Sequence, residues 1–342
     1  MKEILVTGGL GYIGSHTVVE LMKKNYNVSI VDNLSNSEIF ILENIEKITG
    51  RKPNFFNIDL TDYNKTNSCF AKKNYDGVIH FAAFKSVSES VKDPEKYYSN
   101  NLNSLLNILK CMKENKVENI VFSSSCTVYG QPDDLPVSET FPFKEAESPY
   151  ARTKQISENI IEDSTNSISF LSGVSLRYFN PVGAHHSGLI GELPLGTPDN
   201  LVPYITQTAA GIRKKLQIFG DDYDTHDGTA IRDYIHVEDL AEAHIAALQR
   251  MIENKMESKY EYYNIGTGVG YSVLDVVKSF ENVNKLKLNY SFSERRSGDI
   301  EKIFSDCSIS NKKLGWKSKK GLDEMMRSAW KWENNVPGFL SA

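Results

Sequence analysis

The sequence predicts an α/β protein with a doubly wound parallel sheet and a second, smaller mixed α/β lobe toward its C-terminal end. Three observations favour this class. A branched apolar run at residues 4–7 leads directly into a glycine-rich stretch at residues 8–14. Strand and helix patterns then alternate as far as residue 180, which is typical of parallel strands joined by helical crossovers. The 342 residues also exceed what one small core needs.

The glycine-rich stretch is typical of a phosphate-binding turn between a strand and a helix. It reads Gly8-Gly9-Leu10-Gly11-Tyr12-Ile13-Gly14, and its glycines allow a tight turn that brings backbone N–H groups to a pyrophosphate. A second strand at residues 27–31 ends at Asp32, whose carboxylate can bind a ribose 2′-hydroxyl and repels a 2′-phosphate. We therefore expect a Rossmann-type site that prefers NAD to NADP. An ordinary strand–helix turn is the alternative.

The other elements of the sheet follow in order along the chain. Branched and apolar runs predict strands at residues 53–59, 77–82, 119–124 and 173–179, and helical periodicity predicts helices at residues 12–24, 37–49, 97–114 and 150–163. Ligands of such sheets bind beyond the carboxyl ends of the strands. The residues that lie at these ends, and that we therefore expect at one site, are Gly8, Asp32, Asp59, Ala82, Ser125 and Phe179.

The pattern changes after residue 180. Residues 181–203 are rich in Gly and Pro, and a helix is predicted at 201–211. The strand predicted at 232–237 and the helix predicted at 239–251 are assigned back to the large sheet. The expected domains are an NAD-binding domain of residues 1–180, to which 232–260 return, and a substrate lobe of residues 181–231 and 261–342.

Composition excludes several classes of protein. The chain is 40% hydrophobic and 24% charged, with net charge −5 and no basic block, so we expect neither a nucleic-acid nor a membrane partner. Its four cysteines are far apart and favour reduced thiols in a cytoplasmic protein. His185 and His186 lack cysteine or carboxylate partners at metal-site spacing, so no metal is expected.

The stretch from Ser148 to Lys154 carries the strongest chemical signal. Ser148 suits a helix N-cap and Pro149 the first helical position, which places Tyr150 in the first turn and Lys154 one turn later on the same face. A tyrosine of ordinary pKa, about 10, is a poor base at neutral pH. A nearby cation lowers such a pKa by about 1–3 units. We therefore expect Lys154 and a second positive charge, that of oxidised nicotinamide, to act together on Tyr150.

Further short motifs occur in a characteristic order and spacing. With the glycine-rich stretch and Tyr150-x-x-x-Lys154, they resemble the extended short-chain dehydrogenase/reductase family, and within it the epimerases that act on UDP-sugars. The resemblance covers nearly the whole chain. The motifs are His80-Phe81-Ala82, Ser123-Ser124-Ser125-Cys126-Thr127-Val128-Tyr129-Gly130, Leu176-Arg177-Tyr178-Phe179-Asn180-Pro181-Val182-Gly183-Ala184-His185, Asp221 to Gly228 and Arg232-Asp233-Tyr234-Ile235-His236-Val237.

The resemblance implies an enzyme that inverts C4 of UDP-galactose and UDP-glucose through a transient 4-keto sugar, with bound NAD and no net redox change. It assigns catalysis to Ser125, Tyr150 and Lys154, and it implies a homodimer. The residues implied to line the NAD site are Gly8, Gly11, Tyr12, Ile13, Gly14, Asp32, Asn33, Asp59, Leu60, Phe81, Ala82, Lys85, Asn100, Tyr150, Lys154 and Phe179. Those implied to line the UDP-sugar site are Ser125, Asn180, Asn200, Leu201, Phe219, Arg232, Arg296, Asp299 and Ile303.

Other activities share much of this pattern. A sugar-nucleotide 4,6-dehydratase or decarboxylase has the same fold and Tyr-x-x-x-Lys, but the dehydratase needs an acid and a base where this chain has Cys126-Thr127. A ketone reductase with diffusible cofactor and a non-enzymatic NAD-sensing module are further alternatives. Ile303 stands where relatives carry either Tyr or a small residue, which predicts partial acceptance of UDP-GlcNAc and UDP-GalNAc.

Overall fold

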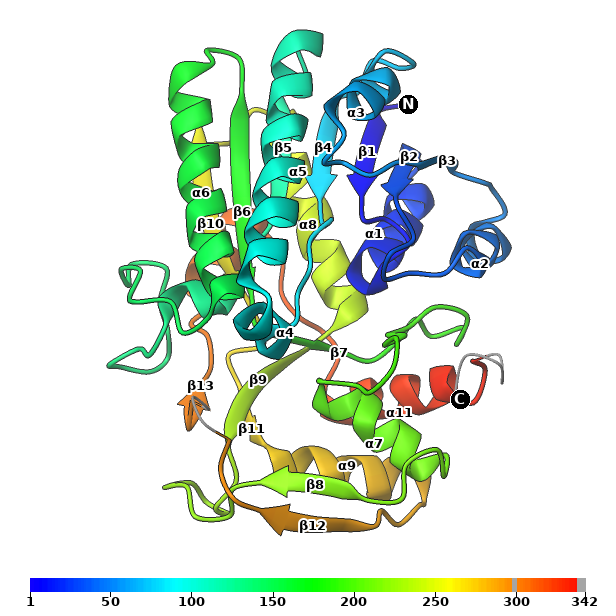
Figure 1. Cartoon of the computed structure of the whole chain (residues 1–342), viewed down its shortest axis with the longest axis vertical. Coiled ribbons are helices and arrows are strands. Elements are labelled where there is room, and N and C mark those ends of the chain that lie inside the picture. The colour runs from blue at the N-terminus through cyan, green and yellow to red at the C-terminus, as the bar shows by residue number, and fades with distance from the viewer. Residues whose placement is uncertain (297–299, 337–342) are drawn as a thin grey trace.

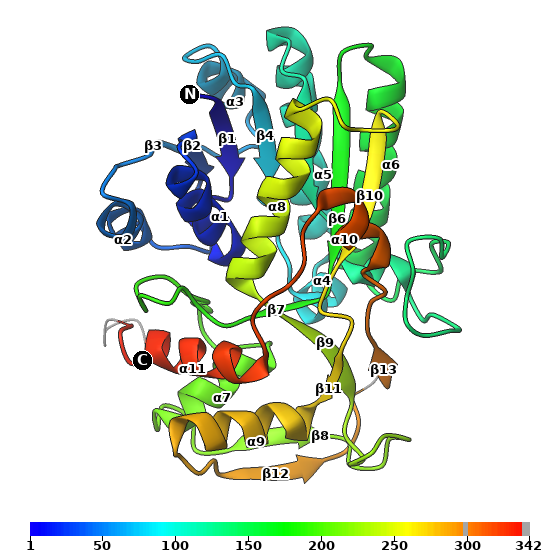
Figure 2. The same ribbon diagram turned by 180° about the vertical axis from the view of Figure 1, so that it is seen from behind.

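The computed structural model describes residues 1–296 and 300–336. Within these ranges the chain forms a large parallel sheet covered by helices on both faces. A smaller mixed lobe lies beyond the carboxyl ends of the strands (Figures 1 and 2). The small lobe lies below the large sheet in Figure 1. The predicted α/β class is confirmed.

In the described part of the chain, seven parallel strands pair in the order β10-β6-β5-β4-β1-β2-β3. The chain runs outward from β1 to β3 and then returns to β4 on the other side of β1, so the strand order reverses between β1 and β4. Such a reversal opens a crevice at the carboxyl ends of the strands, where ligands bind in sheets of this kind. The strands are β1 (Glu3–Thr7), β2 (Asn27–Asp32), β3 (Asn54–Asn57), β4 (Gly77–His80), β5 (Asn119–Ser123), β6 (Ser172–Tyr178) and β10 (Tyr260–Ile265).

Two layers of helices bury the two faces of this sheet. Successive residues of a strand point to opposite faces, so Ile4 and Val6 join one apolar cluster and Leu5 joins the other. The first layer consists of α1 (Tyr12–Lys23), α2 (Phe40–Thr49) and α8 (Val237–Ile252), and the second of α3 (Tyr63–Phe70), α5 (Pro94–Asn115) and α6 (Pro149–Ser167).

The small lobe is built from short strands and helices. Over the described ranges, β7 (Asn180–Val182), β9 (Ile231–His236), β11 (Gly270–Ser272) and β13 (Lys302–Ile303) form one sheet, and β8 (Leu216–Phe219) pairs with β12 (Tyr290–Ser293). Their apolar side chains pack against α7 (Leu201–Ala209), α9 (Val273–Asn284) and α11 (Leu322–Glu333). The remaining helices are α4 (Val87–Lys92), the 3₁₀ helix η1 (Cys126–Tyr129) and α10 (Ser308–Leu314).

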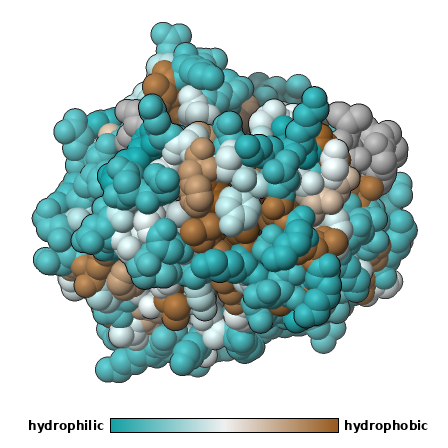
Figure 3. Space-filling model, turned by 90° about the horizontal axis from the view of Figure 1, so that it is seen from below, coloured by the Kyte–Doolittle hydropathy of each residue, from teal (hydrophilic) through white to brown (hydrophobic). Residues whose placement is uncertain are grey.

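The underside of the molecule, seen in Figure 3, is largely hydrophilic around a central apolar area. Helix α10 follows the small lobe in sequence but packs against strand β10 of the large sheet and against helix α8, which covers that sheet (Figure 2). No helix among residues 1–296 and 300–336 is long and apolar enough to cross a membrane.

Two assignments made from the sequence are wrong. The strand predicted at 232–237 is β9, which pairs with β7, β11 and β13 in the small sheet and not with the large sheet. The place beside β6 is taken instead by β10, from the region assigned to the substrate lobe. The helix that follows β9 does return, because α8 packs against α1 and the large sheet.

Candidate active site

Helix α6 places Tyr150 and Lys154 side by side, as the sequence predicts. The Ser148 side chain caps the helix by accepting a hydrogen bond from the backbone N–H of Ala151 at 3.1 Å, and Pro149 occupies the first turn. Tyr150 and Lys154 are one turn apart and face the protein interior, with 9% and 4% of their surfaces exposed. The ammonium nitrogen of Lys154 lies 5.8 Å from the centre of the Tyr150 ring.

Ser125 meets these two residues from the carboxyl end of β5. It follows the strand by two residues and begins η1, where its Oγ accepts a hydrogen bond from the N–H of Thr127 at 3.2 Å. A hydrogen bond from Ser125 to the Tyr150 phenol favours the ionised phenol and acts to lower its pKa. The structure thus brings the three expected catalytic side chains together.

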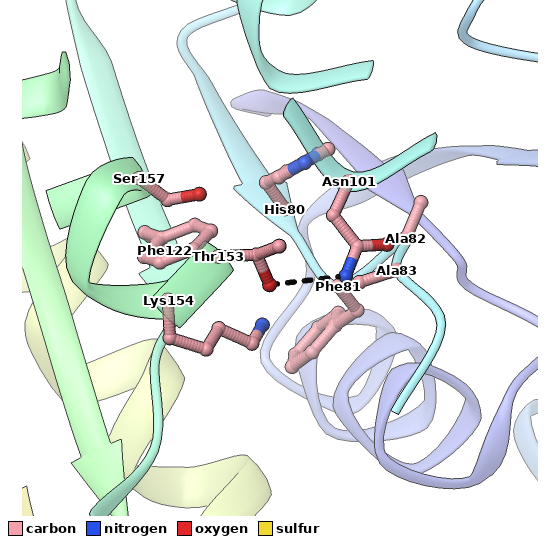
Figure 4. A pocket seen from close by; sticks show the side chains of 9 residues that line it. All are labelled: His80, Phe81, Ala82, Ala83, Asn101, Phe122, Thr153, Lys154 and Ser157. Carbon is pink, nitrogen blue, oxygen red and sulfur yellow. Dashed lines mark hydrogen bonds between the residues drawn. The ribbon is translucent and has the colours of Figure 1, made fainter. Parts of the chain in front are cut away.

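Lys154 is held in a buried position by a backbone carbonyl and an aromatic ring. Its Nζ donates a hydrogen bond to the Ser123 carbonyl oxygen at 2.6 Å and lies 4.8 Å from the centre of the Phe122 ring. Burial lowers the pKa of Lys154 to about 8, and the carboxylate of Glu158 acts in the opposite direction. A small pocket opens beside this side chain, which extends toward Phe81 (Figure 4).

The groups of this chain raise the pKa of Tyr150 above its ordinary value. Burial is the largest cause, because it disfavours the charged phenolate, and the neighbouring Tyr178 acts in the same direction. The hydrogen bond from Ser125 only partly opposes them. The expected lowering of this pKa therefore requires a positive charge beyond those that the chain places here.

The glycine-rich turn has the close backbone approaches that exclude larger residues. Gly8 has φ +65°, and a Cβ there would lie 2.8 Å from the backbone nitrogen of Ala82. A Cβ on Gly14 would lie 2.2 Å from the carbonyl oxygen of Gly8. Gly11 is the N-cap of α1, so the N-terminus of that helix opens directly onto the turn. Such a cradle of backbone N–H groups suits a pyrophosphate.

Asp32 lies beside this turn at the carboxyl end of β2. One carboxylate oxygen accepts a hydrogen bond from the N–H of Leu10 at 3.0 Å, and the other accepts from the Ser37 hydroxyl at 2.9 Å. These bonds hold the carboxylate next to the glycine cradle. The cradle and the carboxylate together fit a dinucleotide whose ribose keeps both hydroxyls.

The other residues expected at the cofactor site lie on α1, on α5, and in the segments that follow β2, β3, β4 and β6. Tyr12 donates its hydroxyl hydrogen to the Gly183 carbonyl oxygen at 2.6 Å. Lys85 forms an ion pair with Glu192 at 2.9 Å. The remainder are Ile13 on α1, the exposed residues Asn33 and Asp59, the buried residues Leu60 and Phe179, Phe81, whose ring centre lies 4.7 Å from that of His244, and Asn100, whose side chain donates a hydrogen bond to Asn101.

The small lobe brings the expected UDP-sugar residues toward this site. Arg232 lies on β9, and its charge acts on the Cys126 thiol next to Ser125. Arg296 lies 4.5 Å from the centre of the Phe219 ring at the end of β8, and the charges of Arg232 and Arg296 both reach Tyr234.

The other predicted substrate residues occupy strand and helix termini. Ile303, 3% exposed, pairs in register with Arg232. Asn180 begins β7, Asn200 is the N-cap of α7, and Leu201 begins that helix. Asp299 lies outside the described residues.

Two features were missed from the sequence. Glu192, in the loop before α7, accepts hydrogen bonds from both Lys85 and Asn200, and no local motif marks it because Lys85 is distant in sequence.

The histidine pair does have a carboxylate partner: Glu238 lies 3.0 Å from His186 and 3.6 Å from His185. The prediction that these histidines lack a carboxylate partner is therefore wrong. The ammonium groups of Lys23 and Lys320 contact His185 and Glu238 at 3.1 and 3.0 Å, and their charge opposes a cation there.

Comparison with known proteins agrees with the fold. A family model described as GDP-mannose 4,6 dehydratase matches residues 5–329. The UDP-glucose 4-epimerase of Drosophila melanogaster is 48% identical over 340 residues, which cover 98% of this chain and 97% of that protein. The crystal structure of the Stenotrophomonas maltophila UDP-glucose 4-epimerase, with bound NAD and formylated UDP-arabinopyranose, has a TM-score of 0.95 at 45% identity and covers 98% of this chain and 99% of that chain.

A second crystal structure, that of the Bifidobacterium longum UDP-glucose 4-epimerase with NAD⁺ and UDP, has a TM-score of 0.93 at 45% identity and covers 98% of this chain and 99% of that one. Fold and site define a short-chain dehydrogenase/reductase with a Ser-Tyr-Lys centre. The chain belongs to the UDP-glucose 4-epimerase family of the extended short-chain dehydrogenase/reductases.

Burial predicts how Tyr150 titrates when the protein is freed of nucleotides. Its phenol should stay protonated up to about pH 10 and beyond, because burial disfavours the phenolate. The measurement is the near-ultraviolet phenolate absorbance of the protein minus that of a Tyr150→Phe variant, across a pH titration. A transition in this difference well below pH 10 would contradict the prediction that burial raises the pKa of Tyr150.

Proposed function

We propose that this protein interconverts UDP-galactose and UDP-glucose by inverting C4, through a 4-keto sugar and with no net redox change. The observation that carries the proposal is the meeting of Ser125, Tyr150 and Lys154 at the carboxyl edge of the same sheet that presents the glycine cradle. The relatives support it, since they are UDP-glucose 4-epimerases that match nearly the full length of this chain.

The cofactor in this proposal is NAD, held across the carboxyl ends of β1, β2 and β4. The backbone N–H groups of the glycine turn would bind its pyrophosphate, and Asp32 would bind the adenosine ribose and repel a 2′-phosphate. When bound, NAD supplies the acceptor that takes the hydride from C4 and gives it back, and a positive charge beside the sugar. The further residues proposed to line this site are Tyr12, Ile13, Asn33, Asp59, Leu60, Phe81, Ala82, Lys85, Asn100 and Phe179.

Tyr150 moves the proton in each half of the reaction. As phenolate it takes the proton of the sugar 4-hydroxyl while the C4 hydride leaves, and it returns that proton when hydride adds to the other face of the 4-keto sugar. Ser125, already bonded to the phenol, shares the proton of the same sugar oxygen. Acid–base catalysis of this kind supplies about 10²–10⁴-fold, and positioning of C4 supplies much of the rest.

Lys154 supplies a buried positive charge to this step. It holds one cation within reach of the Tyr150 ring and anchors it to the Ser123 carbonyl. Because burial alone raises the Tyr150 pKa, that charge must act together with the charge of the oxidised cofactor.

The small lobe would hold the UDP group. Arginines bind a diphosphate through charge-assisted hydrogen bonds. Arg232, near the start of β9, acts through its charge on the Cys126 thiol next to Ser125, and Arg296 lies beside the Phe219 ring at the end of β8. Asn180, Asn200, Leu201, Phe219 and Ser125 complete the proposed substrate contacts, and Asp299, outside the described residues, belongs to the same proposal.

A 4,6-dehydratase is disfavoured by the residues after Ser125. That reaction needs an acid and a base there, but the place holds Cys126 and Thr127. Burial raises the pKa of the Cys126 thiol to about 12, so it is a poor proton donor or acceptor at neutral pH.

Three further proposals concern organisation. Apart from β9 and β10, whose sheets differ from those expected, the division into domains stays a prediction. The homodimer also stays a prediction, for which the chain offers α5, with Leu106 half-exposed on its outer face. A cytoplasmic location is supported by four cysteines that are all free thiols.

Replacing Tyr150 tests the central role. Incubated with UDP-galactose and no added reductant, the protein should form UDP-glucose, as read by NMR of the products. Tyr150→Phe should lower turnover by about 10²–10⁴-fold while bound NAD is kept, because only the proton step is lost. Tyr63→Phe, on the outer helix α3, is the matched control and should keep full activity. Unimpaired Tyr150→Phe would remove Tyr150 from this role.

Ile303 tests the size of the sugar pocket. A side chain of intermediate volume beside Arg232 should allow slow turnover of UDP-GlcNAc. Ile303→Gly should speed that reaction and Ile303→Tyr should abolish it, while both variants keep UDP-galactose turnover. If the unaltered protein fails to convert UDP-GlcNAc even at high enzyme concentration, the proposed tolerance is wrong.

A further inference from the structure

One loop of the small lobe crosses the edge of the large sheet where the cofactor is proposed to bind. This loop, residues 183–200, follows β7 and precedes α7. At its start, the Gly183 carbonyl oxygen accepts a hydrogen bond from the hydroxyl of Tyr12, beside the glycine cradle. At its end, Asp199 accepts hydrogen bonds from the Ser86 and Ser88 hydroxyls at 2.7 and 3.3 Å, at the start of α4. The loop is thus tied at one end to α1 and at the other to the start of α4.

Glu192, within this loop, joins the two proposed ligand sites. A single carboxylate oxygen accepts from Nζ of Lys85 at 2.9 Å and from Nδ2 of Asn200 at 2.7 Å. Lys85 belongs to the proposed NAD site and Asn200 to the proposed UDP-sugar site. Burial raises the pKa of Tyr12, and the charge of Glu192 raises it further, so the carboxylate lies near three groups of the proposed site.

Glu192 is the fixed partner in these contacts. Its side chain is 10% exposed, whereas that of Lys85 is 52% exposed. Trp332, on α11, donates its indole hydrogen to the Glu192 carbonyl oxygen at 2.8 Å, and the preceding Gly191 is packed so closely on the same indole that a Cβ would lie 2.4 Å away. The backbone of Glu192 is therefore fixed against α11, and the more exposed Lys85 is the group that the Glu192 carboxylate positions.

We propose that Glu192 is a positioning residue: it orients Lys85 and Asn200 and closes loop 183–200 over the crevice, so that NAD is retained between turnovers. The inference rests on the proposed function. An epimerase with no net redox change has no need to exchange its cofactor, and every released NAD interrupts turnover. The Glu192–Lys85 ion pair supplies a contact between the two lobes that must open before NAD leaves.

The test is the rate at which NAD dissociates, measured without any UDP-sugar by trapping released NAD with an NAD-dependent reporter enzyme. Glu192→Gln keeps an oxygen for Asn200 but removes the charge that holds Lys85. It should release NAD about fivefold faster, the size expected for a half-exposed ion pair. Glu242→Gln, which removes the surface ion pair with Lys319 at 2.7 Å on α8, is the matched control and should leave the rate unchanged.

A double-mutant cycle separates positioning from a general loosening of the fold. If Glu192 acts through Lys85, Glu192→Gln should add little to the faster release caused by Lys85→Ala, and added salt should speed release from the unaltered protein more than from Glu192→Gln. The pH profile of turnover should be the same for the variant and for the unaltered protein.

The inference is overturned if Glu192→Gln leaves the dissociation rate unchanged, or if it accelerates release equally in the Lys85→Ala background. A protein that holds no NAD at all would overturn the proposed function, and this inference with it. The two failures are therefore distinguishable in one experiment.

Discussion

The buried ammonium group of Lys154 is the interaction on which the rest of the site depends. A charged amine in a protein interior needs polar or aromatic partners. Here the partners are the Ser123 carbonyl oxygen, 2.6 Å from Nζ, and the face of the Phe122 ring. Both come from β5, so the strand that delivers Ser125 also holds the lysine. The same burial that makes this charge effective at short range also raises the pKa of Tyr150. The Tyr150 phenol is therefore expected to stay protonated until the oxidised cofactor adds a second positive charge.

A buried polar network behind α6 keeps this arrangement rigid. Glu158, one turn beyond Lys154, could neutralise the lysine, but its carboxylate is engaged in a bidentate contact with Arg177 on β6 at 2.7–3.2 Å. Both side chains are almost fully buried, and Tyr260 of β10 also donates to Glu158. The pair ties α6 to the strands beneath it. The hydrogen-bond acceptor of Lys154 is the neutral Ser123 carbonyl. Its positive charge is therefore not cancelled by a bonded carboxylate and can act on the Tyr150 phenol.

Local patterns were enough to predict the parallel sheet, the glycine turn and the Tyr150–Lys154 spacing, because each depends on neighbours within a few residues. Pairing between distant strands was not predictable in the same way: β9 has the composition of a core strand, yet β10 takes the place beside β6. Strands as short as β11 and β13 give almost no periodic signal. The rise in the Tyr150 pKa was also hidden, since burial is set by the packed structure and not by spacing. Glu192 was missed because Lys85 lies more than a hundred residues away.

In the proposed reaction, one ionisable phenol, one buried amine and bound NAD act on a single carbon of the sugar. Hydrogen leaves C4 as hydride, stays within the site and returns to the same carbon. The most direct test uses UDP-galactose that carries deuterium at C4, incubated with the protein in ordinary water. We predict that the UDP-glucose formed keeps its deuterium at C4. Loss of that deuterium to the solvent would contradict the account.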